Sequence, residues 1–252
     1  MSGLLPDYSN QAKTYDETRT ASASVLAALR EAIGAHPPAP GRRLLDVGGG
    51  TGNYAAALLG EGWQPVVSDR SPDMLARAGA KGLETVEADA QALPFEDASF
   101  DAVMCVCMLH HVDDQARALA EQRRVLRPGG RGALMAFARE DIADAWYLRY
   151  FPSTRAWMDA SHPPLADLMA LVPGARRIEV VFRDIDGSLG SLTGFPEKVL
   201  DPHWRGQTSY FERLERDHPD ELTAGLARLR ADIASGDPPQ GLGRATVLAW
   251  TP

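Results

Sequence analysis

Short apolar runs recur along this chain, and segments with helically spaced apolar residues separate them. The short runs predict strands at residues 44–47, 65–69, 85–89, 100–109, 132–137, 177–183 and 246–250. The amphipathic segments predict helices at residues 22–33, 55–59, 72–80, 113–126 and 164–172. Because strands alternate with helices, the pattern predicts an α/β fold: a Rossmann-like, seven-stranded, mostly parallel, doubly wound sheet with helices on both faces and inserted lid helices.

Two stretches interrupt this alternation and divide the chain. Residues 139–163 are rich in aromatic side chains compared with the chain average of 7%, and residues 184–243 contain leucines and an isoleucine at helical spacing. Insertions of this length usually form lids or binding elements. The predicted parts are an N-terminal flap and helix at 1–35, a ligand-binding core at 36–138, an aromatic-rich substrate-side insertion at 139–163, a helical lid at 184–243, and the completion of the sheet at 164–183 and 244–252.

Charge and apolar content exclude several partners. The formal net charge is −8 and the 26 basic residues are scattered, so no basic stretch could follow a nucleic-acid backbone. Neither a long apolar span nor a charged-then-apolar leader is present, so we expect a cytoplasmic protein without a membrane partner, as a monomer or homodimer. Cys105 and Cys107 lie two apart in an apolar run; on a strand they would share one face and remain reduced core thiols.

Residues 44–54 join a predicted strand to a predicted helix through four glycines. Such a turn lets a ligand approach the backbone closely. Two ligand classes fit this turn, a dinucleotide and S-adenosylmethionine. Gly50, Gly52 and Ala55 match the dinucleotide fingerprint, and Asp69 lies at the distance along the chain expected for an acid that binds a ribose. Asp46 stands where the strand opens into the turn, and its carboxylate would repel a diphosphate but hold an ammonium. The turn therefore favours a cofactor that bears an amino acid.

Residues 40–137 resemble the class I S-adenosylmethionine-dependent methyltransferases, in the small-molecule branch that includes the ubiquinone/menaquinone type. The glycine turn at 44–52 is similar to motif I of that family, and residues 67–75 resemble its second-strand signature. Similar matches follow in order at residues 87–95, 100–103 and 126–130. The resemblance implies S-adenosylmethionine as cofactor. No set of Asp and Asn residues in the sequence suggests a metal-dependent site, so we expect no metal.

The resemblance also implies the cofactor contacts. The acid at the second strand end, Asp69, would bind both ribose hydroxyls, and Asp89 would accept a hydrogen bond from the adenine amino group beside the Ala90 amide. Met74 would pack against the adenine or belong to the core. The full set of expected cofactor-binding residues is Asp46, Gly48, Gly50, Gly52, Asp69, Arg70, Met74, Asp89, Ala90 and Met108.

The methyl acceptor is less defined by the sequence. His110 and His111 follow the fourth strand, where ligands of open α/β sheets bind, and either is a candidate base or only a part of the pocket wall. The aromatic insertion favours a small, apolar or aromatic metabolite that is O- or C-methylated, as in secondary metabolism. The expected substrate-side residues are Tyr8, Tyr15, Trp146, Tyr150, Trp157 and His203.

Two other functions remain open. A non-methylating enzyme, such as a cyclase, could bind the same cofactor for structural reasons. A nicotinamide-dependent reductase is disfavoured because the chain has no Tyr-x-x-x-Lys pair.

Overall fold

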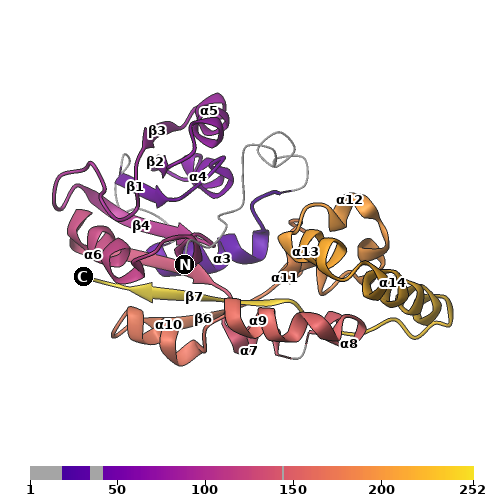
Figure 1. Cartoon of the computed structure of the whole chain (residues 1–252). Helices are drawn as coiled ribbons and strands as arrows, with labels where there is room; N and C mark the ends of the chain where they lie inside the picture. Colours follow the sequence, from indigo (N-terminus) through magenta and orange to yellow (C-terminus); the bar gives the residue numbers. More distant parts are fainter. Residues whose placement is uncertain (1–18, 35–41, 144) are drawn as a thin grey trace.

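The computed structural model describes residues 19–34, 42–143 and 145–252 (Figure 1). Seven strands form one sheet: β1 (Arg42–Val47), β2 (Trp63–Asp69), β3 (Glu84–Glu87), β4 (Phe100–Val106), β5 (Leu126–Ala136), β6 (Arg176–Val181) and β7 (Arg244–Trp250). Their order is β3-β2-β1-β4-β5-β7-β6, with β7 antiparallel to both of its neighbours and the other pairs parallel. The predicted mostly parallel, seven-stranded, doubly wound sheet is confirmed.

The helices of the core begin where local sequence signals place them. Their bounds are α3 (Ala23–Ile33), α4 (Asn53–Leu59), α5 (Pro72–Ala80), α6 (Gln115–Val125) and α10 (Leu165–Leu171). Ser22, Ser71 and Asp114 each cap a helix by accepting a hydrogen bond from a backbone amide of its first turn. These caps satisfy amides that have no partner inside the helix.

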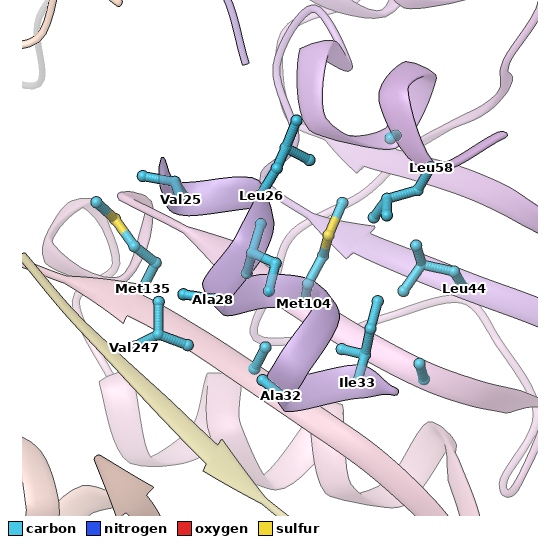
Figure 2. Close-up of a cluster of buried hydrophobic side chains, with 14 of the residues drawn as sticks. Val25, Leu26, Ala28, Ala32, Ile33, Leu44, Leu58, Met104, Met135 and Val247 are labelled. Atoms are coloured by element: carbon cyan, nitrogen blue, oxygen red, sulfur yellow. The ribbon is translucent and has the colours of Figure 1, made fainter. Parts of the chain in front are cut away.

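One face of the sheet is covered by α3, α4 and α5. Figure 2 shows Ala28 and Ile33 of α3 in one apolar cluster with Leu44, Met104 and Val247, which come from three different strands. The opposite face packs against α6 and α10 in a second buried cluster. Each fully buried aliphatic side chain of this kind stabilises the fold by roughly 1.5–3 kcal/mol, and together the two layers fix the sheet that carries the glycine turn.

Three strand ends differ from the prediction. β4 ends at Val106, because Cys107 has a φ of +52°, which breaks an extended strand, and a 3-10 turn (η1, Leu109–His111) follows. β5 already begins at Leu126, and residues 127–130 bulge out between two registers of pairing with β4. β3 ends at Glu87, so Asp89 lies two residues beyond the strand.

The two cysteines therefore do not share a face. Cys105 lies in the buried cluster under α6 and α10, whereas Cys107 packs against the cluster under α3. The expected common face is wrong because the strand stops between them. Both thiols are free, as expected.

The two insertions build one helical layer with its own core. Its helices are α7 (Arg139–Ile142), α8 (Tyr147–Tyr150), η2 (Pro152–Thr154), α9 (Arg155–Ser161), α11 (Leu189–Leu192), η3 (Pro196–Leu200), α12 (Pro202–Arg205), α13 (Ser209–Asp217) and α14 (Pro219–Ala234). Aromatic side chains of α8 pack against α13 and α14 in a third apolar cluster. Phe151 reaches α14 at Gly225, where a Cβ atom would lie 2.2 Å from its ring. Figure 1 shows α12, α13 and α14 to the right of the sheet, beyond α11.

No helix in the described ranges is long and apolar enough to cross a membrane.

Candidate functional site

The glycine turn follows β1 and leads into α4, and its glycines serve different purposes. Gly48, Gly50 and Gly52 have φ values of +65°, +57° and +72°, a region that L side chains rarely adopt. A Cβ atom at Gly48 would lie 2.1 Å from the Met108 side chain, and one at Gly52 would lie 2.5 Å from Leu83. At Gly50 a Cβ atom would meet nothing within 4 Å, so this glycine borders open space. Gly48 and Gly50 line a cavity, whereas the structure gives Gly52 a packing role against the core.

Asp46 lies directly below this turn and is 2% exposed. Its Oδ1 atom is buried and has no hydrogen-bond partner. Burial, and secondarily the charge of Asp69, raises the pKa of Asp46 to about 7. A buried carboxylate without a partner is costly, and a ligand cation would relieve that cost. Gly49 makes room for the Asp46 carboxylate, because a Cβ atom at residue 49 would lie 2.5 Å from that carboxylate.

Asp69 at the end of β2 fastens the turn. Its Oδ2 accepts a hydrogen bond from the Gly50 amide at 2.9 Å, and its Oδ1 accepts one from Ser71 at 2.9 Å. A carboxylate has about four lone-pair positions, so it can still accept two hydroxyl groups. From the other side, Lys81 Nζ donates to the Thr51 carbonyl at 2.9 Å and to the Asn53 side chain at 2.5 Å.

The predicted adenine-side residues lie after β3 and in α5. Asp89 is half-buried and accepts from the Gln91 amide at 2.9 Å, which is the main cause that lowers the pKa of Asp89. Ala90 is 6% exposed and belongs to the apolar cluster under α6, and Met74 is 4% exposed. Arg70 is exposed, and its charge also lowers the pKa of Asp89. An ionised acid beside a small apolar surface suits an aromatic amine.

A cavity of about 120 Å³ opens above the turn. Asp46 and the glycines form one side, and Val106, Met135 and Phe137 at the ends of β4 and β5 form an apolar side. Arg19 also lines the cavity, and its guanidinium donates to the Gln207 carbonyl at 2.8 Å. The carboxylate of Asp46 and the guanidinium of Arg19 are the pair of groups that an ammonium and a carboxylate on one ligand require.

Two lining residues did not stand out in the sequence. Arg19 belongs to a polar N-terminal stretch with no distinguishing motif, and Asn53 Nδ2 ties its backbone to the turn at 2.8 Å. Asp186 follows β6, far along the chain from the glycine turn, yet it lines the same cavity and is 6% exposed. The single feature that could have pointed to Arg19 is its place as a basic residue just before the first predicted helix, and Asp186 has no comparable feature.

His110 and His111 form most of the 3-10 turn after β4, with ring centroids 3.8 Å apart. Burial lowers the pKa of His111, and the charge of Asp69 partly opposes this. Desolvation, followed by the charges of the nearby His111 and His162, lowers the pKa of His110 to about 3. Neither ring lines the cavity; His162 packs edge-on against Phe137, which does. His110 and His111 are therefore neutral at pH 7, and the lowered pKa makes each a weaker base than a free imidazole.

The predicted substrate-side residues are mostly placed elsewhere. Trp146 is 1% exposed in the third apolar cluster, and its indole donates to the Thr193 carbonyl at 2.8 Å. The Tyr150 hydroxyl donates to Asp232, and Trp157 stacks on Tyr210 at 5.4 Å. None of these three residues lines the cavity, because their aromatic side chains pack in the apolar cluster that the two insertions form together.

Three further predicted substrate-side residues lie away from the cavity or outside the described part of the chain. His203 is exposed on α12 and packs edge-on against Trp204. Tyr8 and Tyr15 lie outside the described residues. Within the described residues, no cluster of three or more metal-ligating side chains occurs.

Several known proteins are similar to this chain in sequence or in fold. The profile of the family described as "Methyltransferase domain" matches residues 45–134. A ubiquinone/menaquinone biosynthesis C-methyltransferase of Acidiphilium cryptum is 37% identical over 125 residues, which cover 46% of this chain and 50% of that protein. A demethylmenaquinone methyltransferase of Mycolicibacterium vanbaalenii is 31% identical over 189 residues, which cover 66% of this chain and 79% of that protein. The chain thus spans about half the length of the first curated relatives, and more of others.

Among solved structures, a protein from Anabaena variabilis described as a methyltransferase of an antibiotic biosynthesis pathway matches with a TM-score of 0.73 at 23% identity, over 92% of this chain and 98% of that one. A [4+2]-cyclase matches with a TM-score of 0.56 at 22% identity, over 90% of this chain and 80% of that one. These two show a shared fold. The relative from Mycolicibacterium vanbaalenii is also 31% identical over 79% of its own length. On that ground the chain belongs to the class I S-adenosylmethionine-dependent methyltransferases.

Proposed function

We propose that this protein transfers the methyl group of S-adenosylmethionine to oxygen or carbon of a small, apolar or aromatic organic metabolite. The observation that carries the proposal is the cavity above the glycine turn. Its lining includes Asp46, whose buried Oδ1 has no partner, and Gly50, where a Cβ atom would meet nothing within 4 Å. A dinucleotide would bring a diphosphate to this carboxylate, whereas S-adenosylmethionine brings an ammonium.

The residues of the site divide the cofactor between them. Asp46 would hold the ammonium and Arg19 the carboxylate of its methionine part, while Asp69 would accept hydrogen bonds from both ribose hydroxyls. Asp89 would accept from the adenine amine, and Met108, held against Gly48, would bound the pocket. When bound, the cofactor supplies an electrophilic methyl group. The protein contributes position and the exclusion of water.

The acceptor class rests on the apolar wall and on the relatives. Val106, Met135 and Phe137 form a surface that suits an aromatic or aliphatic ring. The names of the curated relatives refer to menaquinone and ubiquinone biosynthesis, which supports a quinone-like or similar ring. His110 and His111 remain candidate bases to be tested, although neither lines the cavity. We further propose a role in secondary metabolism and a cytoplasmic location, as a monomer or homodimer.

The test combines binding with transfer. Calorimetry with S-adenosylhomocysteine, S-adenosylmethionine and NADH should show micromolar binding of the first two only. Incubation with methyl-labelled S-adenosylmethionine and a panel of phenols, naphthols, reduced quinones, indoles and sugars should then label an aromatic acceptor. Binding of NADH alone would refute the cofactor assignment.

A cyclase that binds the same cofactor is the second candidate, because a [4+2]-cyclase shares the fold over most of both chains. Tight binding of S-adenosylmethionine together with unlabelled products across the whole panel would favour it.

A further inference from the structure

Asp186 is a buried acid on the far wall of the cavity. It follows β6, is 6% exposed, and lines the cavity together with Val106, Met135 and Phe137. Asp46, the other acid of this cavity, stands on the glycine-turn side. The two carboxylates come from β1 and from the segment after β6, and three strands separate β1 from β6 in the sheet.

The carboxylate of Asp186 is held in one orientation. Its Oδ1 accepts hydrogen bonds from the Ser188 amide at 2.9 Å and the Ser188 hydroxyl at 2.5 Å, and its own amide donates to Ser191 Oγ at 3.2 Å. Two residues earlier, Asp184 accepts hydrogen bonds from Ser22, Ala23 and Ser24 and thereby fixes this segment to the start of α3.

Among the described residues, Oδ2 of Asp186 accepts no hydrogen bond and is not one of the fully enclosed atoms without a partner. It is thus a preoriented acceptor that remains open to a ligand.

The charges around the cavity restrict the ligand that Asp186 meets. The charged side chains among the described lining residues are Asp46, Asp186 and Arg19. S-adenosylmethionine carries a net single positive charge, from its sulfonium and ammonium against its carboxylate. With that cofactor bound, the cavity is neutral, so a neutral acceptor adds no unpaired buried charge.

We propose that Asp186 binds the methyl acceptor, an inference that rests on the proposed function. Its carboxylate would accept a hydrogen bond from the hydroxyl of a neutral aromatic substrate, and the ring of that substrate would pack against Val106, Met135 and Phe137. A carboxylate accepts and cannot donate, so it selects for an O–H group over an ether at the same place. A hydrogen bond to an ionised, desolvated acceptor is among the stronger ones, and its loss leaves that acceptor unpaired.

The probes are 1-naphthol, 1-methoxynaphthalene and 1-naphthylmethylammonium, which share one ring system and differ in the group offered to Asp186. Their dissociation constants are measured by tryptophan fluorescence or calorimetry on the full chain saturated with sinefungin, a non-reactive cofactor analogue whose extra ammonium keeps the net single positive charge of S-adenosylmethionine. The wild type should bind 1-naphthol about tenfold more tightly than 1-methoxynaphthalene.

Asp186→Asn tests the assignment without changing the side chain's shape. If the Asn carbonyl keeps the Ser188 bonds, its amino group faces the cavity, and it can donate equally to a hydroxyl or an ether oxygen. The variant should therefore bind 1-naphthol and 1-methoxynaphthalene with about equal affinity, and its affinity for S-adenosylhomocysteine should be unchanged. Asp201→Asn is the matched control, because Asp201 is an exposed cap of α12 outside the cavity and Asn caps a helix equally well.

The outcomes separate the two levels of the argument. A wild type that fails to bind S-adenosylhomocysteine refutes the proposed function itself. If the wild type binds it but does not prefer 1-naphthol, or prefers the ammonium probe, only the assignment of Asp186 is overturned. A loss of S-adenosylhomocysteine affinity in Asp186→Asn would instead place Asp186 on the cofactor and overturn it as well.

Discussion

Replacing Asp46 by Asn should stabilise the free protein above neutral pH and weaken its binding of the cofactor. The side chain is 2% exposed and its Oδ1 has no partner, and burial raises its pKa to about 7 from an ordinary value near 4. Between these two values the folded protein keeps a proton that the unfolded chain has already released. The free energy of unfolding therefore falls as pH rises through this window, and the loss is complete above pH 7.

The size of this effect follows from the shift. A difference of about three pH units at 1.36 kcal/mol each gives an upper limit of about 4 kcal/mol, of which roughly 2–3 kcal/mol appears between pH 5 and pH 8. Asn has a similar shape and cannot ionise. The variant should consequently gain about 2–3 kcal/mol relative to the wild type over that pH range, whatever constant cost its own buried amide carries.

Cofactor affinity should change in the opposite sense. An ammonium binds the ionised form of Asp46, so the affinity of the wild type for S-adenosylhomocysteine should fall about tenfold from pH 8 to pH 6. Asp46→Asn should bind at least about tenfold more weakly at pH 8 and lose most of this pH dependence.

Urea unfolding at several pH values measures the first effect, and calorimetry measures the second. The three histidines with lowered pKa values, His110, His111 and His162, also change stability with pH, in the direction of greater stability at higher pH. They are present in both proteins, so the difference between variant and wild type removes their contribution. A difference in unfolding free energy that stays constant from pH 5 to pH 8 would refute the reasoning about Asp46.

The remaining predictions concern the turn and the histidines. Asp69→Ala should weaken S-adenosylhomocysteine binding by about 1–3 kcal/mol in calorimetry, since charge-assisted hydrogen bonds are lost; an unchanged affinity would contradict its ribose-binding role. Gly52→Ala should lower the free energy of unfolding by about 2–4 kcal/mol, because its Cβ would meet Leu83 at a positive φ. Gly60→Ala, in open space at negative φ, should change it by less than about 0.5 kcal/mol. If His110 or His111 is the base, its alanine variant should lose about 10²–10⁴-fold in turnover with cofactor binding retained; full turnover from pH 6 to pH 8 would remove that residue as a base.

Local sequence signals predicted the core elements well because each depends on neighbours in the chain. Ser22 and Ser71 cap helices that begin at the next residue, and the four glycines break the chain between β1 and α4. The prediction failed where a backbone angle rather than apolarity ends an element. The apolar run through Cys107 continues to Leu109, yet a positive φ at Cys107 stops the strand.

The aromatic insertion shows a different limit of the sequence. High aromatic content predicts burial but does not say against which surface. Here Phe151 and its neighbours find partners on α13 and α14, from the second insertion, so the aromatic rings complete a helical core and do not line the cavity. The prediction that Trp146 meets the substrate treated the two insertions separately, whereas they bury each other's apolar faces.

The doubly wound sheet, the glycine turn and the acids at or just beyond the strand ends were predictable from the sequence, because hydrophobic period, turn chemistry and capping act over a few residues. That Arg19 and Asp186 share a cavity with Asp46 is visible in the folded molecule alone. These three residues are far apart in the chain, and they meet because the cap made by Asp184 brings the start of α3 and the segment after β6 to the same edge of the sheet. Such a meeting depends on packing between distant elements, for which no local pattern carries a signal.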